Sequence, residues 1–146
     1  MDGSAAPIDD AILEMIADRA QTHSLVGAVH TEHTGGMTSL VTIELDSDRY
    51  PGNIQDARIE IQWHTNGDYN FHYIETHTAD DIWQCRWDKH MNPHTTRTHF
   101  HPPPEASSAD AIPDRPSDCH PTGIFTRTLA NVRQRVDDLW GFEVDS

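Results

Sequence analysis

Three successive segments of the chain, residues 57–64, 69–76 and 82–88, alternate between apolar and polar side chains. An alternation of period two is typical of β-strands, because successive side chains point to opposite faces of a sheet. The segments are close in sequence and separated by turn-forming residues, so they predict an antiparallel meander. The apolar face of this meander would carry Ile59, Ile61, Trp63, Tyr69, Phe71, Tyr73, Trp83, Cys85 and Trp87.

The first turn of the meander determines how its strands pair. A two-residue turn at Asn66-Gly67 would place Ile61 opposite His72 and mix the two faces. A three-residue loop with Gly67 in the left-handed conformation places Ile61 opposite Phe71 instead. Register normally follows the hydrophobic pattern, so we predict the second arrangement. The opposite, polar face would then carry Arg58, Glu60, Gln62, His64, Asn70, His72, Gln84, Arg86 and Asp88.

Helical periodicity flanks the meander at both ends of the chain. Residues 7–23 repeat apolar side chains at helical spacing, with two aspartates in the first turn, and residues 122–140 carry a second apolar stripe before Gly141 as a C-terminal stop. Residues 37–45 predict another strand, and residues 25–30 a weaker one. The pattern therefore predicts an α+β fold: an antiparallel β-meander of four to five strands with the N- and C-terminal helices packed on one face.

The chain length of 146 residues suits a single domain spanning residues 1–146. Residues 102–121 are rich in Pro, Ser, Ala and Asp without periodicity, and we expect a mobile connector before the C-terminal helix. No apolar run approaches the length of a membrane span, and the first residues lack the features of a signal peptide. A cytoplasmic protein that does not associate with membranes is therefore the expectation.

The charge of the chain is extreme. It contains 24 acidic and 10 basic residues, a formal net charge of −14, and 17 of the acids are Asp while Lys89 is the single lysine. Such a surface would repel nucleic acid at low ionic strength. Abundant Asp with almost no Lys is also typical of cytoplasmic proteins from extreme halophiles, where the Debye length falls to about 3 Å in molar salt. The composition therefore predicts a halophilic protein, and a local basic site on it could still bind phosphate.

Histidine is concentrated in one short segment. Four of the 11 histidines, His90, His94, His99 and His101, fall within 12 residues that directly follow Arg86-Trp87-Asp88. Histidine is the side chain whose charge changes near neutral pH, and it is the commonest metal ligand. The segment and the adjoining polar face are the candidate site.

Three functions remain open for this segment, beside a purely structural role in which the histidines hydrogen-bond the backbone of a long loop. Two imidazoles from His99-x-His101 on one side of an extended chain could bind zinc or another transition metal, with Asp88, His90 or His94 as further ligands. Alternatively, the histidines could form an interface in a partner-binding module without catalysis. The remaining function is cleavage of an RNA phosphodiester without a metal or other cofactor, which needs a base, an acid and a cation. Its candidate catalytic residues are His72, Arg86, Asp88, His90, His94, His99 and His101.

The order of these motifs resembles the TumE-like toxins of type II toxin–antitoxin systems. The resemblance rests on Arg86-Trp87-Asp88, His90, Asn92-Pro93-His94 and His99-Phe100-His101, and it covers residues 57–141. The chain departs from the family pattern in a longer loop after His101, and residues 1–50 do not align. The resemblance implies a growth-inhibiting protein directed at RNA or translation, with a cognate antitoxin encoded nearby. A homodimer is a further candidate assembly, and the acidic composition indicates a halophilic relative.

Overall fold

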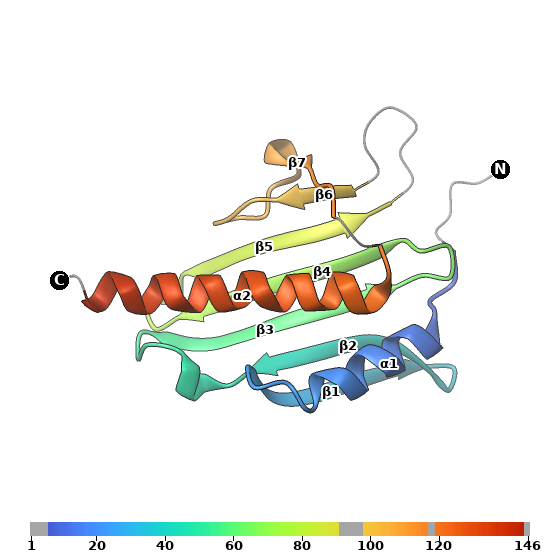
Figure 1. Ribbon diagram of the computed structural model, residues 1–146, viewed down its shortest axis with the longest axis horizontal. Helices are drawn as coiled ribbons and strands as arrows, with labels where there is room; N and C mark the ends of the chain where they lie inside the picture. The colour runs from blue at the N-terminus through green and yellow to red at the C-terminus, as the bar shows by residue number, and fades with distance from the viewer. Residues whose placement is uncertain (1–5, 91–97, 117–118, 145–146) are drawn as a thin grey trace.

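A single antiparallel sheet dominates the fold. The computed structural model describes residues 6–90, 98–116 and 119–144, and in these ranges seven strands lie in the sheet in the order of the sequence (Figure 1). The strands are β1 (Val26–Thr34), β2 (Met37–Leu45), β3 (Ile54–Trp63), β4 (Tyr69–His77), β5 (Ile82–Lys89), β6 (Thr98–His101) and β7 (Ile112–Pro113). The helices are α1 (Asp10–Ala20) and α2 (Pro121–Val144), with the short 3-10 helices η1 (Ser47–Arg49) and η2 (Ser108–Asp110).

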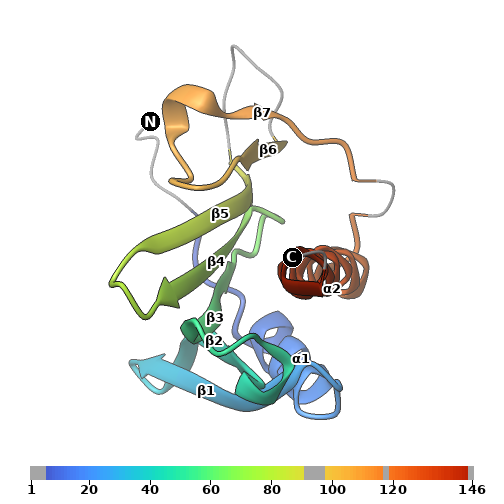
Figure 2. The same cartoon turned by 90° about the vertical axis from the view of Figure 1, so that its left-hand side faces the viewer.

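Both α-helices cover the same face of the sheet, as predicted (Figure 2). The hydrophobic core lies between them and the sheet, and it includes Leu13 and Ile16 of α1 and Leu129 and Val132 of α2. The predicted apolar face of the meander is buried in this core, with Trp83 only partly buried. The opposite face of the sheet has no helix over it in the described part of the chain, and it carries the polar side chains.

The predicted strand register is confirmed. Trp63 pairs with Tyr69 and Ile61 pairs with Phe71. The loop between these strands closes as predicted, with Gly67 at a φ of 89° and a 2.8 Å hydrogen bond from the amide of His64 to the carbonyl of Asp68. The apolar pairs that this register aligns, Trp63 with Tyr69, Ile61 with Phe71 and Ile59 with Tyr73, therefore point toward the helices, whereas Ile74 lies opposite Arg58 on the other face.

The expected number of strands, four to five, is too low. The sheet continues beyond β5 through β6 and β7, which pair antiparallel with register partners such as Phe100 and Ile112. β6 has four residues and β7 has two, one of them a proline, so neither presents enough alternation to be recognised from sequence. Proline is tolerated in β7 because this strand lies at the edge of the sheet.

The helix boundaries also differ from the prediction, and α1 is shorter than residues 7–23 at both ends. Helix α1 begins at Asp10, and Asp9 caps it by accepting a 3.2 Å hydrogen bond from the amide of Ile12. Helix α2 does not stop at Gly141 but continues to Val144. A glycine lowers helix stability without ending a helix.

The segment expected as a mobile connector contains regular structure in its described part. It forms η2 and β7, and Asp114 accepts two hydrogen bonds from the guanidinium of Arg127 on α2, at 2.8 and 2.6 Å. These bonds tie the segment to the C-terminal helix. None of the helices in the described ranges is both long and apolar enough to cross a lipid bilayer.

Candidate functional site

Strand pairing brings most of the predicted site residues into two rows on the polar face. In the first row, His72 of β4, Arg86 of β5 and His101 of β6 are direct cross-strand neighbours. In the second row, Asn70, Asp88 and His99 occupy the same three strands. Directly opposed residues lie on the same face of a sheet with their Cβ atoms about 4.5–5.5 Å apart. Strand β6 therefore places two of the clustered histidines beside the polar side chains of β4 and β5.

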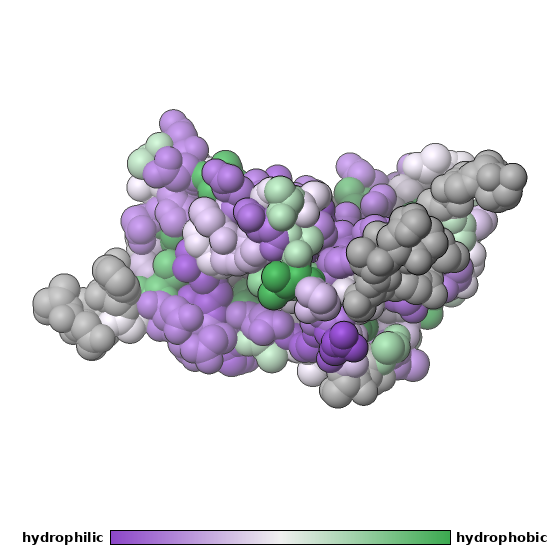
Figure 3. Space-filling view, turned by 90° about the horizontal axis from the view of Figure 1, so that it is seen from above, coloured by the Kyte–Doolittle hydropathy of each residue, from purple (hydrophilic) through white to green (hydrophobic). Residues whose placement is uncertain are grey.

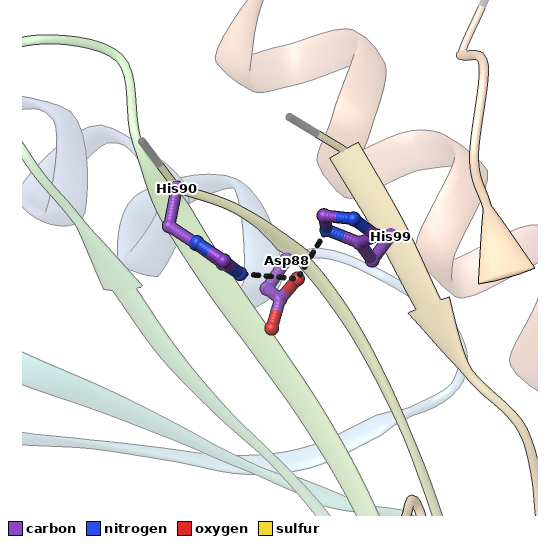
Figure 4. Close-up of side chains that lie close together, drawn as sticks. All are labelled: Asp88, His90 and His99. Atoms are coloured by element: carbon purple, nitrogen blue, oxygen red, sulfur yellow. Dashed lines mark ion pairs between the residues drawn. The ribbon is translucent and has the colours of Figure 1, made fainter. Parts of the chain in front are cut away.

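Asp88 is the centre of this site. Its Oδ2 lies 2.9 Å from Nε2 of His101 and 3.5 Å from Nε of Arg86. Its Oδ1 faces two further imidazoles, 3.8 Å from Nδ1 of His99 and 3.9 Å from Nε2 of His90 (Figure 4). The residue is only 9% exposed. A carboxylate of this burial needs positive or donating neighbours, and His101 supplies a hydrogen bond at Oδ2, while the imidazoles that face Oδ1 lie beyond hydrogen-bonding distance.

The contacts of His101 indicate which of its ring nitrogens carries a proton. Nη2 of Arg86 lies 3.5 Å from Nδ1 of His101 and can only donate a hydrogen bond. The carboxylate of Asp88 can only accept, so Nε2 of His101 carries the proton of the 2.9 Å hydrogen bond to Oδ2. His101 is 4% exposed, so its ring is held by Arg86 on one side and Asp88 on the other. This arrangement fits a positioning role for His101 toward Asp88.

His72 lies in the site, but its imidazole is oriented by a side chain other than its cross-strand neighbour. Glu60 is its cross-strand neighbour, as the register requires. The imidazole nevertheless hydrogen-bonds Oε1 of Gln84 at 2.8 Å through Nε2. The carboxylate of Glu60 accepts instead from Nε of Arg58, 3.1 Å away on its own strand. Strand pairing places the His72 side chain on the polar face. Competition among the neighbouring polar side chains determines its hydrogen-bond partner.

Three side chains have donor atoms close enough to share one metal ion. One atom from each of Asp88, His90 and His99 lies within 4.8 Å of the others, and the rings of His90 and His99 are stacked with their centroids 5.3 Å apart. Asp88 is buried, His99 is intermediate and His90 is exposed. His101, expected as a ligand together with His99, is not a member of this group. Its ring centroid lies 6.4 Å from that of His99.

One predicted site residue is not placed. His94 belongs to residues 91–97, which lie outside the described residues. The surface seen from the β6–β7 side is mostly hydrophilic, with small hydrophobic patches among the polar side chains (Figure 3). Exposed Ile112 of β7 is among the apolar residues of this part of the sheet.

Sequence reasoning missed a buried polar network on the helix-covered face. Glu75 of β4 is fully buried and accepts two 2.8 Å hydrogen bonds from Arg135 of α2. Burial alone would raise the pKa of Glu75, but the hydrogen bonds from Arg135 and Tyr73 outweigh it and lower that pKa. The signal was present, because Glu75 continues the apolar parity of Phe71 and Tyr73. An acid at such a position requires a cation from the covering helix.

The same face contains a hollow of about 520 Å³ between α2 and the last strands of the sheet. Its walls include Trp83, Trp87, Phe100 and Arg135, whose guanidinium carbon lies 3.6 Å from the centroid of the Trp83 ring. The hollow is on the opposite face of the sheet from Asp88. We therefore assign the histidine chemistry to the polar face and not to this hollow.

Comparison with known proteins identifies the family. Residues 13–139, most of the chain, match the family described as toxin TumE. No curated protein and no solved structure matches the chain. The match begins within α1, includes the whole sheet and ends within α2. It therefore corrects the expectation that residues 1–50 do not align, since residues 13–50 belong to the matched region. The chain belongs to the TumE toxin family.

Proposed function

We propose that this protein is a growth-inhibiting toxin that acts on RNA through the polar face of its sheet. The observation that carries the proposal is the gathering of Arg86, His90, His99 and His101 around the buried carboxylate of Asp88. Family membership supports the toxin part of the proposal. The chemistry of these side chains supports a phosphodiester as the target.

The side chains present match the requirements of RNA cleavage. The reaction needs a base to accept the proton of the 2′-hydroxyl, an acid to protonate the leaving 5′-oxygen, and positive charge on the phosphate. Imidazoles can accept and donate protons near neutral pH. Arg86 supplies a permanent cation with a geometry suited to phosphate oxygens. His72, next to Arg86 across the sheet, is a further proton carrier.

A toxin of this kind requires a neutralising partner. We propose a cognate antitoxin encoded nearby, as the family implies, and action in the cytoplasm. The net charge of −14 opposes the approach of RNA at low salt, since both molecules are anionic. Molar salt screens that repulsion to a few ångströms, which supports a halophilic setting for the activity.

Controlled expression in a halophilic host tests the proposal. Induction of the wild type should arrest growth, and a His99→Ala/His101→Ala double variant should relieve the arrest. His30→Ala is the matched control, because His30 also pairs with a carboxylate, Glu44, but lies on β1 away from the site. RNA integrity and amino-acid incorporation are measured at the onset of arrest.

The outcomes separate the parts of the proposal. Arrest with cleaved RNA or halted translation, lost in the double variant and kept in His30→Ala, supports the whole proposal. Arrest with intact RNA and normal translation would show a toxin with a different target. Equal inhibition by the wild type and the double variant, or none by either, would overturn the role of the histidine site.

A further inference from the structure

We infer that Asp88, His90 and His99 form a binding site for a divalent transition-metal ion. One donor atom from each side chain lies within 4.8 Å of the others, and Oδ1 of Asp88 faces Nε2 of His90 and Nδ1 of His99 (Figure 4). Two imidazoles and one carboxylate are the ligands that zinc and related ions take in catalytic sites, where three protein groups leave a fourth position open. Pure oxygen sites, by contrast, suit magnesium and calcium.

The donor atoms are farther apart than in an occupied metal site, so the side chains must move closer together when an ion binds. Oδ1 of Asp88 is 3.8 and 3.9 Å from the two nitrogens. Ligand bonds of about 2.0–2.1 Å in a tetrahedron require donors about 3.3 Å apart. For these two contacts the excess is roughly half an ångström. The two imidazole donors, within 4.8 Å of each other, must also approach, and side-chain rotation can bring both changes about. His90 is half exposed and follows directly on β5, so it is the ligand most able to move.

The contacts of the Asp88 carboxylate favour its role as a metal ligand. His101 and Arg86 both approach Oδ2. Oδ1 is buried and has no hydrogen-bond partner among the described residues. A buried acceptor without a hydrogen bond costs free energy in a folded protein, so each such atom requires a physical explanation. A cation beside Oδ1 would provide one. The contacts to Oδ2 would then orient the carboxylate, as outer groups do around metal ligands.

Strand pairing explains why the three ligands meet. Asp88 and His99 are direct partners in the β5–β6 ladder, so their side chains stand together on the polar face. His90 follows Asp88 by two residues and therefore returns to the same face. His101 lies one pair further along the ladder, opposite Arg86, and its Nε2 is engaged by Asp88. The structure thus favours His90 over His101 as the second imidazole.

The inference concerns the same site as the proposed function and deepens it. A metal held here would add positive charge beside Arg86, where a phosphate would bind. His90 and His99 would then act as ligands, leaving His72 as the proton carrier of the first row. Metal binding is measured on the purified protein without any growth assay, so its failure is distinguishable from failure of the proposed toxicity.

The test uses the full chain purified without a histidine tag and stripped of metal by a chelator. Zn²⁺ binding is measured by calorimetry, and Co²⁺ serves as a spectroscopic probe of ligand geometry. We expect one equivalent of Zn²⁺ and a visible Co²⁺ absorption typical of nitrogen and oxygen ligands. His90→Ala and His99→Ala should each weaken binding by about 100-fold or more, beyond the effect of losing an outer-shell group, and change the Co²⁺ spectrum. His101→Ala should weaken it about 10–100-fold, as for an outer-shell group, with the stoichiometry unchanged.

His30→Ala is the control for binding by the other histidines, since His30 forms an exposed pair with Glu44. It should bind as the wild type does, and circular dichroism of every variant verifies the fold. The inference would be overturned if no saturable site appears at one equivalent. It would equally fail if His90→Ala and His99→Ala, both folded, bind Zn²⁺ as tightly as His30→Ala. Tight binding in His90→Ala together with complete loss in His101→Ala would identify a different ligand set and also overturn it.

Discussion

Arg135 of α2 donates two parallel hydrogen bonds, each 2.8 Å long, to the two carboxylate oxygens of Glu75 in β4. Glu75 is fully buried, and it also accepts a 2.6 Å hydrogen bond from the hydroxyl of Tyr73. The guanidinium stacks on the ring of Trp83 at the same time. This pair holds α2 at one position along the sheet.

Replacing Arg135 with alanine should lower the free energy of unfolding by about 3–5 kcal/mol, because Glu75 would remain buried without its counter-ion. Urea denaturation followed by tryptophan fluorescence measures the loss. The matched control is Arg133→Ala, since Arg133 is exposed and its contact is a 3.3 Å hydrogen bond to Ser24. It should change stability by no more than about 0.5 kcal/mol.

A double variant distinguishes loss of the pair from loss of packing. Glu75→Leu/Arg135→Met removes both charges and retains much of the apolar volume, so it should be clearly more stable than Arg135→Ala alone. Equal stability of the two variants would show that the guanidinium stabilises the protein by its contact with Trp83 and not by neutralising Glu75.

Acid should remove the stabilising effect of Glu75. Its pKa is lowered in the folded protein from an ordinary value of 4.5, so the folded state binds fewer protons than the unfolded state. The stabilisation is therefore complete above pH 4.5 and is lost as the pH falls through the folded pKa. The stability difference between wild type and Glu75→Gln should shrink as the pH is lowered from 5 to 3. A difference that stays constant over this range would contradict the assignment.

The two cysteines should differ in reactivity. Burial raises the pKa of the Cys85 thiol to about 12, so it stays protonated and covered at neutral pH. Cys119 is exposed. A thiol-specific chromogenic reagent should label one cysteine in the native protein and two in urea, and Cys119→Ser should abolish the native labelling. Rapid labelling of Cys85 in folded Cys119→Ser would show that the core opens beside Trp83.

Salt should stabilise the protein strongly at neutral pH. A net charge of −14 produces self-repulsion that 1 M KCl screens to within about 3 Å. A gain of about 2 kcal/mol between 0.1 and 1 M KCl would raise the Tm by roughly 4–8 °C in a chain of this size. The same experiment near the isoelectric point of 4.9 should show a smaller gain, because the net charge is small there. Equal gains at both pH values would contradict charge screening as the cause.

The sequence by itself determined the faces of the central strands and the register of β3 with β4. The side-chain period of a strand is two, so the alternation in Ile59 to Trp63 and in Tyr69 to Tyr73 assigns each residue to a face without further information. The loop at Gly67 then allows a single register that keeps the apolar side chains together. The same local logic located both helices and found the buried stripe of α2, while in α1 it found only part of the buried face.

Only the tertiary structure decided which histidines meet and what holds them. The pairing of β5 with β6 places His99 beside Asp88, and it depends on strand segments too short to show a pattern. Side-chain partners such as Gln84 for His72, or Arg135 for Glu75, are chosen by competition among groups distant in sequence. A hydrophobic pattern records which side of an element is buried, because burial repeats with the period of that element. A polar contact joins one residue of each of two elements and does not repeat along either element. It therefore leaves no periodic pattern in the sequence.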